Sequence, residues 1–181
     1  MNVTLFPVNP FVENTYILWT RKGGEAAIVD PGMMREDERH MINEFIKENE
    51  LILKHVLITH IHIDHVTSAR WIAEQYAALV EGDKLEEPYG LSLHTQAEHF
   101  RLRINVDALK FDKYLKENDI INLGEERIIV LSTPGHSAGS LSFYAPESNF
   151  VITGDALFEG SIGRTDLPGG DYDKLISSIR N

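Results

Sequence analysis

Residues 59–65 constrain this chain more than any other stretch, because they concentrate side chains that bind metals. They read Thr59-His60-Ile61-His62-Ile63-Asp64-His65 and follow a short apolar run that is typical of a buried strand. Alternate side chains of an extended chain point to the same side, which predicts that His60, His62 and Asp64 face one point. His65 would then enter a first helical turn and face the same point. Imidazole and carboxylate groups together suit zinc, iron or manganese.

The length and composition fit one globular domain. The chain has 181 residues, of which 43% are hydrophobic and 25% are charged, and these are ordinary values for a protein with a sizeable core. We therefore expect a single domain spanning residues 1–181. The formal net charge of -11 disfavours nucleic acid as a partner, because phosphate binding requires a basic surface.

The chain contains no cysteine, which excludes disulfides, thiolate zinc sites and a cysteine nucleophile. Its first residues lack the basic and apolar regions of a signal peptide. No apolar stretch approaches the length that crosses a membrane. These features predict a soluble, cytoplasmic protein that acts away from membranes.

Both strands and helices are expected in the first half of the chain. The expected strands lie at 3–6, 15–19, 26–29 and 51–58, and the expected helices lie at 35–49 and 67–76. The histidine-rich stretch therefore follows the carboxyl end of a buried strand. Ligands usually bind at such ends in open α/β sheets.

Polar and turn-forming residues at 80–90 predict a loop beside this site. A short strand at 91–93, a helix that begins with a capping box of Thr95 and Glu98, and a weak helix at 107–118 would follow. The remaining expected elements are a hairpin at 120–131, strands at 141–144 and 150–152, and a helix at 171–180.

Further candidates for the site also follow expected strands. His136 lies in a tight loop between Pro134-Gly135 and Ala138-Gly139, and it is a natural third ligand beside the histidine-rich stretch. Asp155 follows a strand and a glycine, so it is either a turn cap or a ligand, and the earlier sites favour a ligand. Asp30 begins a turn, where it is either a cap or a carboxylate next to the metal site.

Other polar candidates have weaker patterns. His94 and His99 flank the start of an expected helix, and a surface role is expected for both. Arg164 lies in a glycine-containing loop at 160–166, where it would either pair with a carboxylate or meet a substrate. No Ser-His-Asp arrangement is evident, and no pattern identifies substrate-binding residues.

Three motifs resemble those of the metallo-β-lactamase fold superfamily, at 60–65, 135–136 and 154–155. Three further stretches are similar to its glyoxalase II-like branch, at 9–16, 29–32 and 160–166. This branch comprises hydroxyacylglutathione hydrolase relatives that lack a helical glutathione-binding domain. The resemblance implies a four-layer αββα sandwich of the α/β (α+β) class, with two divalent metal ions at one edge, zinc first among the candidates.

The same resemblance implies a role for each candidate ligand. His60, His62 and His136 would hold the first metal ion. Asp64 and His65 would hold the second, and Asp155 would bridge the two ions.

The family has one more ligand, a histidine after a final strand, and no histidine follows His136 here. The second metal ion would then have only Asp64, His65 and Asp155 from the protein. The chain could be a truncated form, its second site could be weak, or another group could substitute, for which His94 is the only candidate. A missing last strand would leave a sheet edge uncovered and favour a homo-oligomer.

These features predict a metal-dependent hydrolase of the glyoxalase II-like kind. A bound metal lowers the pKa of water to near 7 and so supplies hydroxide, which Asp64 could orient. The resemblance implies a small-molecule thioester as the substrate, such as a hydroxyacylglutathione.

Two other functions stay open. A persulfide dioxygenase of the same branch would use one iron ion, held by His60, His136 and Asp155. A truncated or inactive member would serve as a metal-binding or interaction domain. A lactamase is disfavoured because no export signal is present, and a nuclease is disfavoured by the acidic charge and the short chain.

Overall fold

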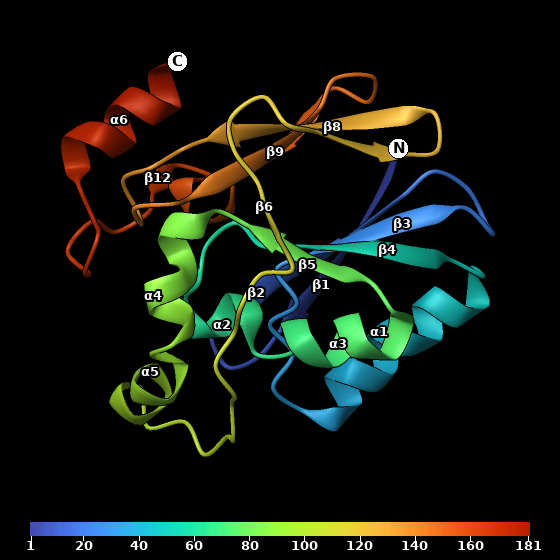
Figure 1. The fold of residues 1–181 in the computed structure, drawn as a ribbon, viewed down its shortest axis with the longest axis horizontal. Helices are drawn as coiled ribbons and strands as arrows, with labels where there is room; N and C mark the ends of the chain where they lie inside the picture. Colours follow the sequence, from blue (N-terminus) through green and yellow to red (C-terminus); the bar gives the residue numbers. More distant parts are fainter.

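Two β-sheets packed face to face form the centre of the protein, in a computed structural model that describes residues 1–181 (Figure 1). The first sheet has six strands in the order β1-β2-β3-β4-β5-β6, and the second has four in the order β10-β9-β8-β7. The strands of the first sheet are β1 (Asn2–Val8), β2 (Glu13–Trp19), β3 (Glu25–Val29), β4 (Ile52–Leu57), β5 (Leu79–Gly82) and β6 (Lys113–Tyr114). Those of the second are β7 (Ile120–Leu123), β8 (Glu126–Ser132), β9 (Leu141–Ala145) and β10 (Phe150–Ile152). Two short strands, β11 (Leu157–Phe158) and β12 (Ser161–Ile162), pair separately.

Helices α1 (Glu36–Glu48) and α3 (Ala69–Tyr76) lie on the side of the first sheet that faces away from the second sheet (Figure 1). Helix α6 (Tyr172–Arg180) lies on the side of the second sheet and begins where the Asp171 side chain caps it. The layers thus follow the expected αββα order. The shorter helices are α2 (Ile63–Val66), α4 (Glu87–Gly90) and α5 (Leu93–His99), with 3-10 turns η1 (Lys84–Glu86) and η2 (Gly154–Ala156). No helix combines the length and the apolar composition that a membrane crossing requires.

Alternating side chains of the first sheet supply two hydrophobic cores. Ile28 and Val56 point to the helices and pack in one core with Ile42 of α1. Val29 and Leu57, their neighbours in sequence, belong to the other core, which lies between the sheets. The carboxyl ends of β3 and β4 are therefore apolar on both faces, which explains the continuous apolar runs that precede the site.

The topology collects loops at one end of the sandwich. Strands β3, β4 and β5 are parallel, so their carboxyl ends meet at one edge of the first sheet. Strands β8 and β10 are both antiparallel to β9, so their carboxyl ends also share an edge. The segments that follow these strands contain Asp30, residues 59–65, Glu86, His136 and Asp155.

The structure corrects several expected elements. The expected loop at 80–90 contains β5, η1 and α4, because buried polar residues disguise a strand there. Residues 91–93 are not a strand: 91 and 92 form a turn, and Leu93 begins α5, before the expected capping box. Residues 107–118 contain no helix, because Leu109 is buried in the helix-side core and Phe111 packs against it, and these contacts override a weak helical pattern.

Glu81 on β5 is a carboxylate whose side chain has no exposed surface. It pairs with His55 of β4, and its Oε2 lies 2.7 Å from Nζ of Lys113 on β6. Burial alone would raise the pKa of Glu81, but the hydrogen bonds from His55 and Lys113 outweigh burial and lower the pKa. These contacts fasten the short strand β5 to both of its neighbours.

Replacing this carboxylate tests the role of the contacts. Glu81→Gln should lower the free energy of unfolding by about 1–3 kcal/mol, because the variant gives buried donors a weaker acceptor. The folded state lowers the pKa of Glu81, so the carboxylate stabilises the fold above the ordinary value of 4.5, and this contribution is lost as the pH falls further. Urea titrations should show that the difference in the free energy of unfolding between the unmodified protein and Glu81→Gln shrinks below pH 4.5. Glu74 is exposed, so Glu74→Gln is the control, and an equal decrease in its free energy of unfolding would contradict this account.

Candidate metal centre

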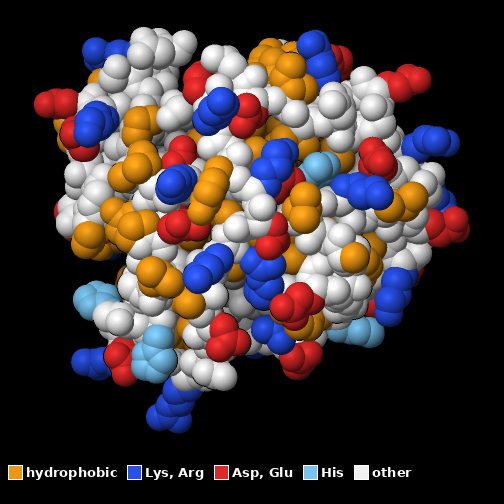
Figure 2. All heavy atoms as spheres, in the orientation of Figure 1, with side chains coloured by type: hydrophobic (Ala, Val, Ile, Leu, Met, Phe, Trp, Pro, Cys, Tyr) orange, Lys and Arg blue, Asp and Glu red, His pale blue; other side chains and the backbone are white.

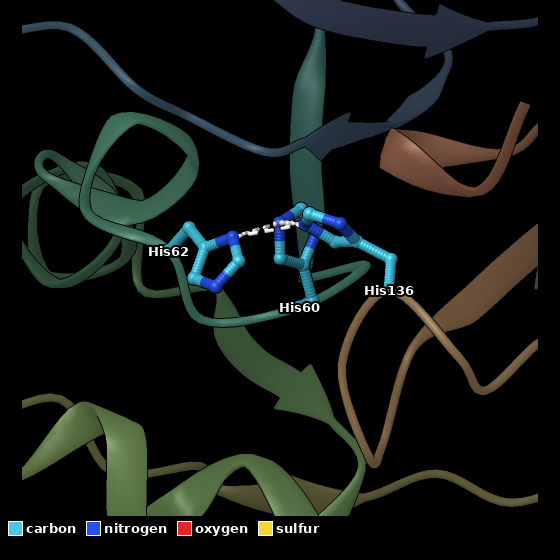
Figure 3. Close-up of side chains that lie close together, drawn as sticks. All are labelled: His60, His62 and His136. Atoms are coloured by element: carbon cyan, nitrogen blue, oxygen red, sulfur yellow. Dashed lines mark hydrogen bonds between the residues drawn. The ribbon is translucent and has the colours of Figure 1, made fainter. Parts of the chain in front are cut away.

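Three histidine side chains converge on one point (Figure 3). His60 and His62 come from the loop after β4, and His136 comes from the loop after β8. Nε2 of His136 lies 3.1 Å from Nε2 of His60 and 2.9 Å from Nδ1 of His62. The other two nitrogens are 3.1 Å apart. The structure therefore brings together the three residues expected to hold the first metal ion.

The outer nitrogens of two rings determine where the imidazole protons lie. Nδ1 of His136 is 2.8 Å from the carbonyl oxygen of Arg164, which can only accept, so Nδ1 carries the hydrogen. Nδ1 of His60 is 3.0 Å from Oγ1 of Thr59, which donates its own hydrogen to Asp30. Neutral rings at both positions therefore present Nε2 lone pairs to each other across 3.1 Å. Such lone pairs repel unless a cation or the Nδ1 hydrogen of His62 lies between them.

The environment keeps the rings of His60 and His62 neutral. Burial, and then the neighbouring histidines, lower the pKa of His60 well below its ordinary value. Burial and His136 lower the pKa of His62 to about 3. Neutral imidazole is the form that binds metals, so these two side chains are ready to act as ligands at neutral pH.

His65 lies at the centre of a second group. Its Nε2 is 3.3 Å from Oδ1 of Asp155 and 3.7 Å from Oδ2 of Asp64. Its Nδ1 is 3.1 Å from Oδ2 of Asp30. Burial alone would lower the pKa of His65, but hydrogen bonds to Asp155 and Asp30 outweigh burial and raise the pKa well above its ordinary value. A metal ion bound here would replace the proton on Nε2.

Asp155 connects the two groups. Its Oδ1 faces His65, and its Oδ2 lies 3.6 Å from Nε2 of His136. Burial alone would raise the pKa of Asp155, but the hydrogen bond from His65 and the charges of the surrounding histidines together outweigh burial and lower the pKa. One carboxylate oxygen directed at each group is the arrangement that a bridging ligand requires.

Local backbone structure divides the histidine-rich stretch between these groups. His62 is the N-cap of α2, and Asp64 and His65 lie in the helix itself. Asp64 therefore faces His65 and not the three converging histidines, and the expectation that it shares a side with His60 and His62 is wrong. The helical turn is the physical reason, because it ends the period-2 alternation at His62.

Two glycines allow the backbone to approach the carboxylate-bearing segments closely. A Cβ added at Gly163 would lie 1.8 Å from the carbonyl oxygen of Asp155, and one added at Gly32 would lie 1.8 Å from that of Asp64. Neither position has room for a side chain. The glycine-containing stretches that follow β3 and β12 thus have a packing role at the site.

Supporting residues fix the ligand loops from outside. Asp30 accepts hydrogen bonds from the backbone nitrogen (2.8 Å) and Oγ1 (2.6 Å) of Thr59, in addition to its contact with His65. This favours the view of Asp30 as a carboxylate next to the metal site. The side chain of Asn9 donates to the carbonyl oxygens of Gly32 (3.0 Å) and Asp64 (2.9 Å).

Sequence reasoning missed the contributions of Asn9 and Glu86. The sequence places Asn9 in a stretch that is similar to the glyoxalase II-like branch but assigns it no role, and it places Glu86 in an expected loop. Glu86 follows the parallel strand β5, so recognition of that strand would have directed attention to it.

Other sequence candidates lie apart from the two groups. The side chain of His94 is 74% exposed and pairs with Glu98, so it does not stand in for a ligand. The guanidinium of Arg164 lies 2.7 Å from Asp166, which favours a structural pairing. Basic and acidic side chains are interspersed over the face shown in Figure 2.

A cavity of about 360 Å³ opens beside the second group. Asp64, His65 and Asp155 are among the residues that line it. Apolar side chains line other parts of it, namely Phe11, Val12, Tyr16, Leu157 and Phe158. A small molecule can therefore reach the carboxylates of the second group.

Comparison with known sequences gives the same family as the motifs. The model of the metallo-beta-lactamase superfamily matches residues 8–181. Hydroxyacylglutathione hydrolase GloC of Haemophilus influenzae is 38% identical over 182 residues, which cover 99% of this chain and 83% of that protein. This similarity confirms the expected resemblance to the hydroxyacylglutathione hydrolase branch.

Comparison with solved structures confirms the expected fold. The B3 metallo-beta-lactamase BLEG-1 is similar with a TM-score of 0.84 and 30% identity, over 99% of this chain and 84% of that chain. TTHA1623, solved in a di-iron-bound form, has a TM-score of 0.84 and 33% identity, over 98% of this chain and 84% of that chain.

Removal of one converging histidine tests the first group. His136→Ala should reduce the metal content of the purified protein by about one ion per chain, because a zinc site of this kind needs three protein ligands. Elemental mass spectrometry measures the change. His94→Ala removes an exposed histidine and serves as the matched control. An unchanged metal content in His136→Ala would show that this group does not bind metal.

Proposed function

The chain belongs to the metallo-β-lactamase superfamily, and we propose that it is a metal-dependent hydrolase of small-molecule thioesters. The observation that carries the metal dependence is the convergence of neutral imidazoles, with lone pairs of His60 and His136 facing each other across 3.1 Å. The similarity to a hydroxyacylglutathione hydrolase supports the thioester as substrate.

The ligand set that we propose comprises both groups of side chains. His60, His62 and His136 hold one divalent metal ion. Asp64 and His65 hold a second, with Asp155 between them. The donor atoms are nitrogen and oxygen only, and they fit zinc, iron or manganese. We propose zinc first, and a relative that was solved with two iron ions makes iron the second candidate.

Asp64 and Asp155 have different roles in the proposed hydrolysis. A bound divalent metal supplies Lewis acidity, which lowers the pKa of water to near 7 and polarises a carbonyl oxygen. Asp64 lines the cavity, and burial raises the pKa of its carboxyl group. It can therefore orient the attacking water and accept its proton. Asp155 keeps one oxygen toward each group and so maintains their separation.

The metal content and the reaction are the first properties to measure. Protein purified with zinc should contain up to two ions per chain and should hydrolyse a hydroxyacylglutathione thioester, which releases a free thiol. Chelation should abolish thiol release, and added zinc should restore it, because the proposed mechanism depends on the metal.

The rival functions give different results in the same experiment. About one iron ion per chain, with oxygen uptake in the presence of a glutathione persulfide, would replace the hydrolase with a dioxygenase. Full metal content without turnover of any thioester in a panel would leave a metal-binding or interaction domain. His136→Ala, assayed in parallel, separates metal-dependent turnover from contaminating hydrolases.

A further inference from the structure

Glu86 is a buried carboxylate that lies between the loops carrying the converging histidines. It is the last residue of η1, and it is only 1% exposed. Its Oε2 accepts a hydrogen bond from the backbone nitrogen of Ile61 at 2.8 Å. Its Oε1 accepts from Oγ of Ser137 at 2.7 Å and from the backbone nitrogen of Gly139 at 2.8 Å. The three hydrogen bonds that the Glu86 carboxylate accepts thus all come from these two loops.

The donors to Glu86 are sequence neighbours of the proposed ligands. Ile61 lies between His60 and His62, and Ser137 follows His136. One oxygen of the carboxylate therefore fixes the loop after β4, and the other fixes the loop after β8. A displacement of either oxygen would move one loop relative to the other.

The loop after β8 is shaped to receive this carboxylate. A Cβ added at Gly139 would lie 3.0 Å from Cγ and 3.1 Å from Oε1 of Glu86, which is closer than side chains normally approach. A backbone hydrogen bond from Leu141 to the carbonyl oxygen of Thr59 (2.8 Å) also joins the two segments, but it lies where the loops leave their strands. Glu86 joins them beside the histidines.

We propose that Glu86 is a positioning residue, whose carboxylate sets the spacing of His60, His62 and His136 for one metal ion. This inference rests on the proposed metal centre, and it does not depend on the identity of the substrate. Outer contacts of this kind generally contribute to metal affinity by orienting the ligands.

An isosteric substitution removes the charge and one acceptor. In Glu86→Gln the side chain has one oxygen and one amide NH2 group, so either Ile61 or Gly139 must face a donor in place of an acceptor. One loop is then released, whichever way the amide is oriented. The zinc dissociation constant should rise about 10–100-fold.

A second variant disturbs the contact between Glu86 and Gly139 by changing the glycine. Gly139→Ala keeps the carboxylate but places a methyl group against it, so Glu86 and the loop after β8 must separate. Its zinc affinity should fall in the same direction as that of Glu86→Gln.

The matched control is Glu81→Gln, which removes another buried carboxylate, on β5 of the first sheet. Its partners are His55 and Lys113, and neither lies in a ligand loop. This variant should lose thermal stability yet keep the zinc affinity of the unmodified chain.

The experiment measures zinc affinity by competition with a chromophoric chelator, together with the visible spectrum of the Co²⁺-loaded protein. We expect weaker zinc binding and an altered Co²⁺ spectrum in Glu86→Gln and Gly139→Ala, and neither change in Glu81→Gln. Thioester hydrolysis by Glu86→Gln should recover at saturating zinc, because the ligands themselves are intact.

The outcomes separate this inference from the proposed function. Zinc affinity and a Co²⁺ spectrum in Glu86→Gln that match those of the unmodified chain would overturn the role of Glu86 and leave the metal centre standing. Equal weakening in Glu81→Gln would also overturn it, because general destabilisation would then explain the loss. If the unmodified chain binds neither ion, the metal centre and the role of Glu86 both fall.

Discussion

The arrangement of the site depends on one electrostatic constraint. The inward nitrogens of His60, His62 and His136 lie 2.9–3.1 Å from one another, and hydrogen bonds to their outer sides turn two lone pairs inward. Burial makes protonation costly, so the repulsion cannot be relieved by adding charge to the rings. A divalent cation at the common point removes the repulsion and satisfies the lone pairs together. The folded protein is therefore prepared for a metal ion by its hydrogen bonds and not by its histidines alone.

The fold supplies these hydrogen bonds from segments that are distant in sequence. Parallel strands of the first sheet bring Asp30, the histidine-rich stretch and Glu86 to one edge, and the second sheet adds His136 and Asp155. Asp30 and Glu86 act on the same loop, since one accepts from Thr59 and the other from Ile61. Such buried carboxylates are stable because every donor around them is used, and no buried polar side-chain atom lacks a partner.

Much of this arrangement was predictable from the sequence, and the remainder depended on tertiary contacts. The apolar runs before the histidine-rich stretch and before His136 indicated buried strands, and the spacing of the histidines indicated a metal site. The family resemblance implied the separation of Asp64 from His62, but the period-2 pattern did not, because the separation depends on a helix that begins at Ile63. Glu86 was missed because β5 carries the buried Glu81, which gives the strand the appearance of a polar loop. Residues 107–118 were mistaken for a helix because burial of Leu109 outweighs local propensity there.

The most direct test of the account is the position of bound metal, measured by anomalous X-ray diffraction from crystals of the zinc-loaded protein. The account predicts an anomalous peak about 2.0–2.1 Å from Nε2 of His60, Nδ1 of His62 and Nε2 of His136, which is the usual zinc–imidazole distance. The absence of a peak at this point, with an empty space between three hydrogen-bonded rings in zinc-soaked crystals, would contradict it.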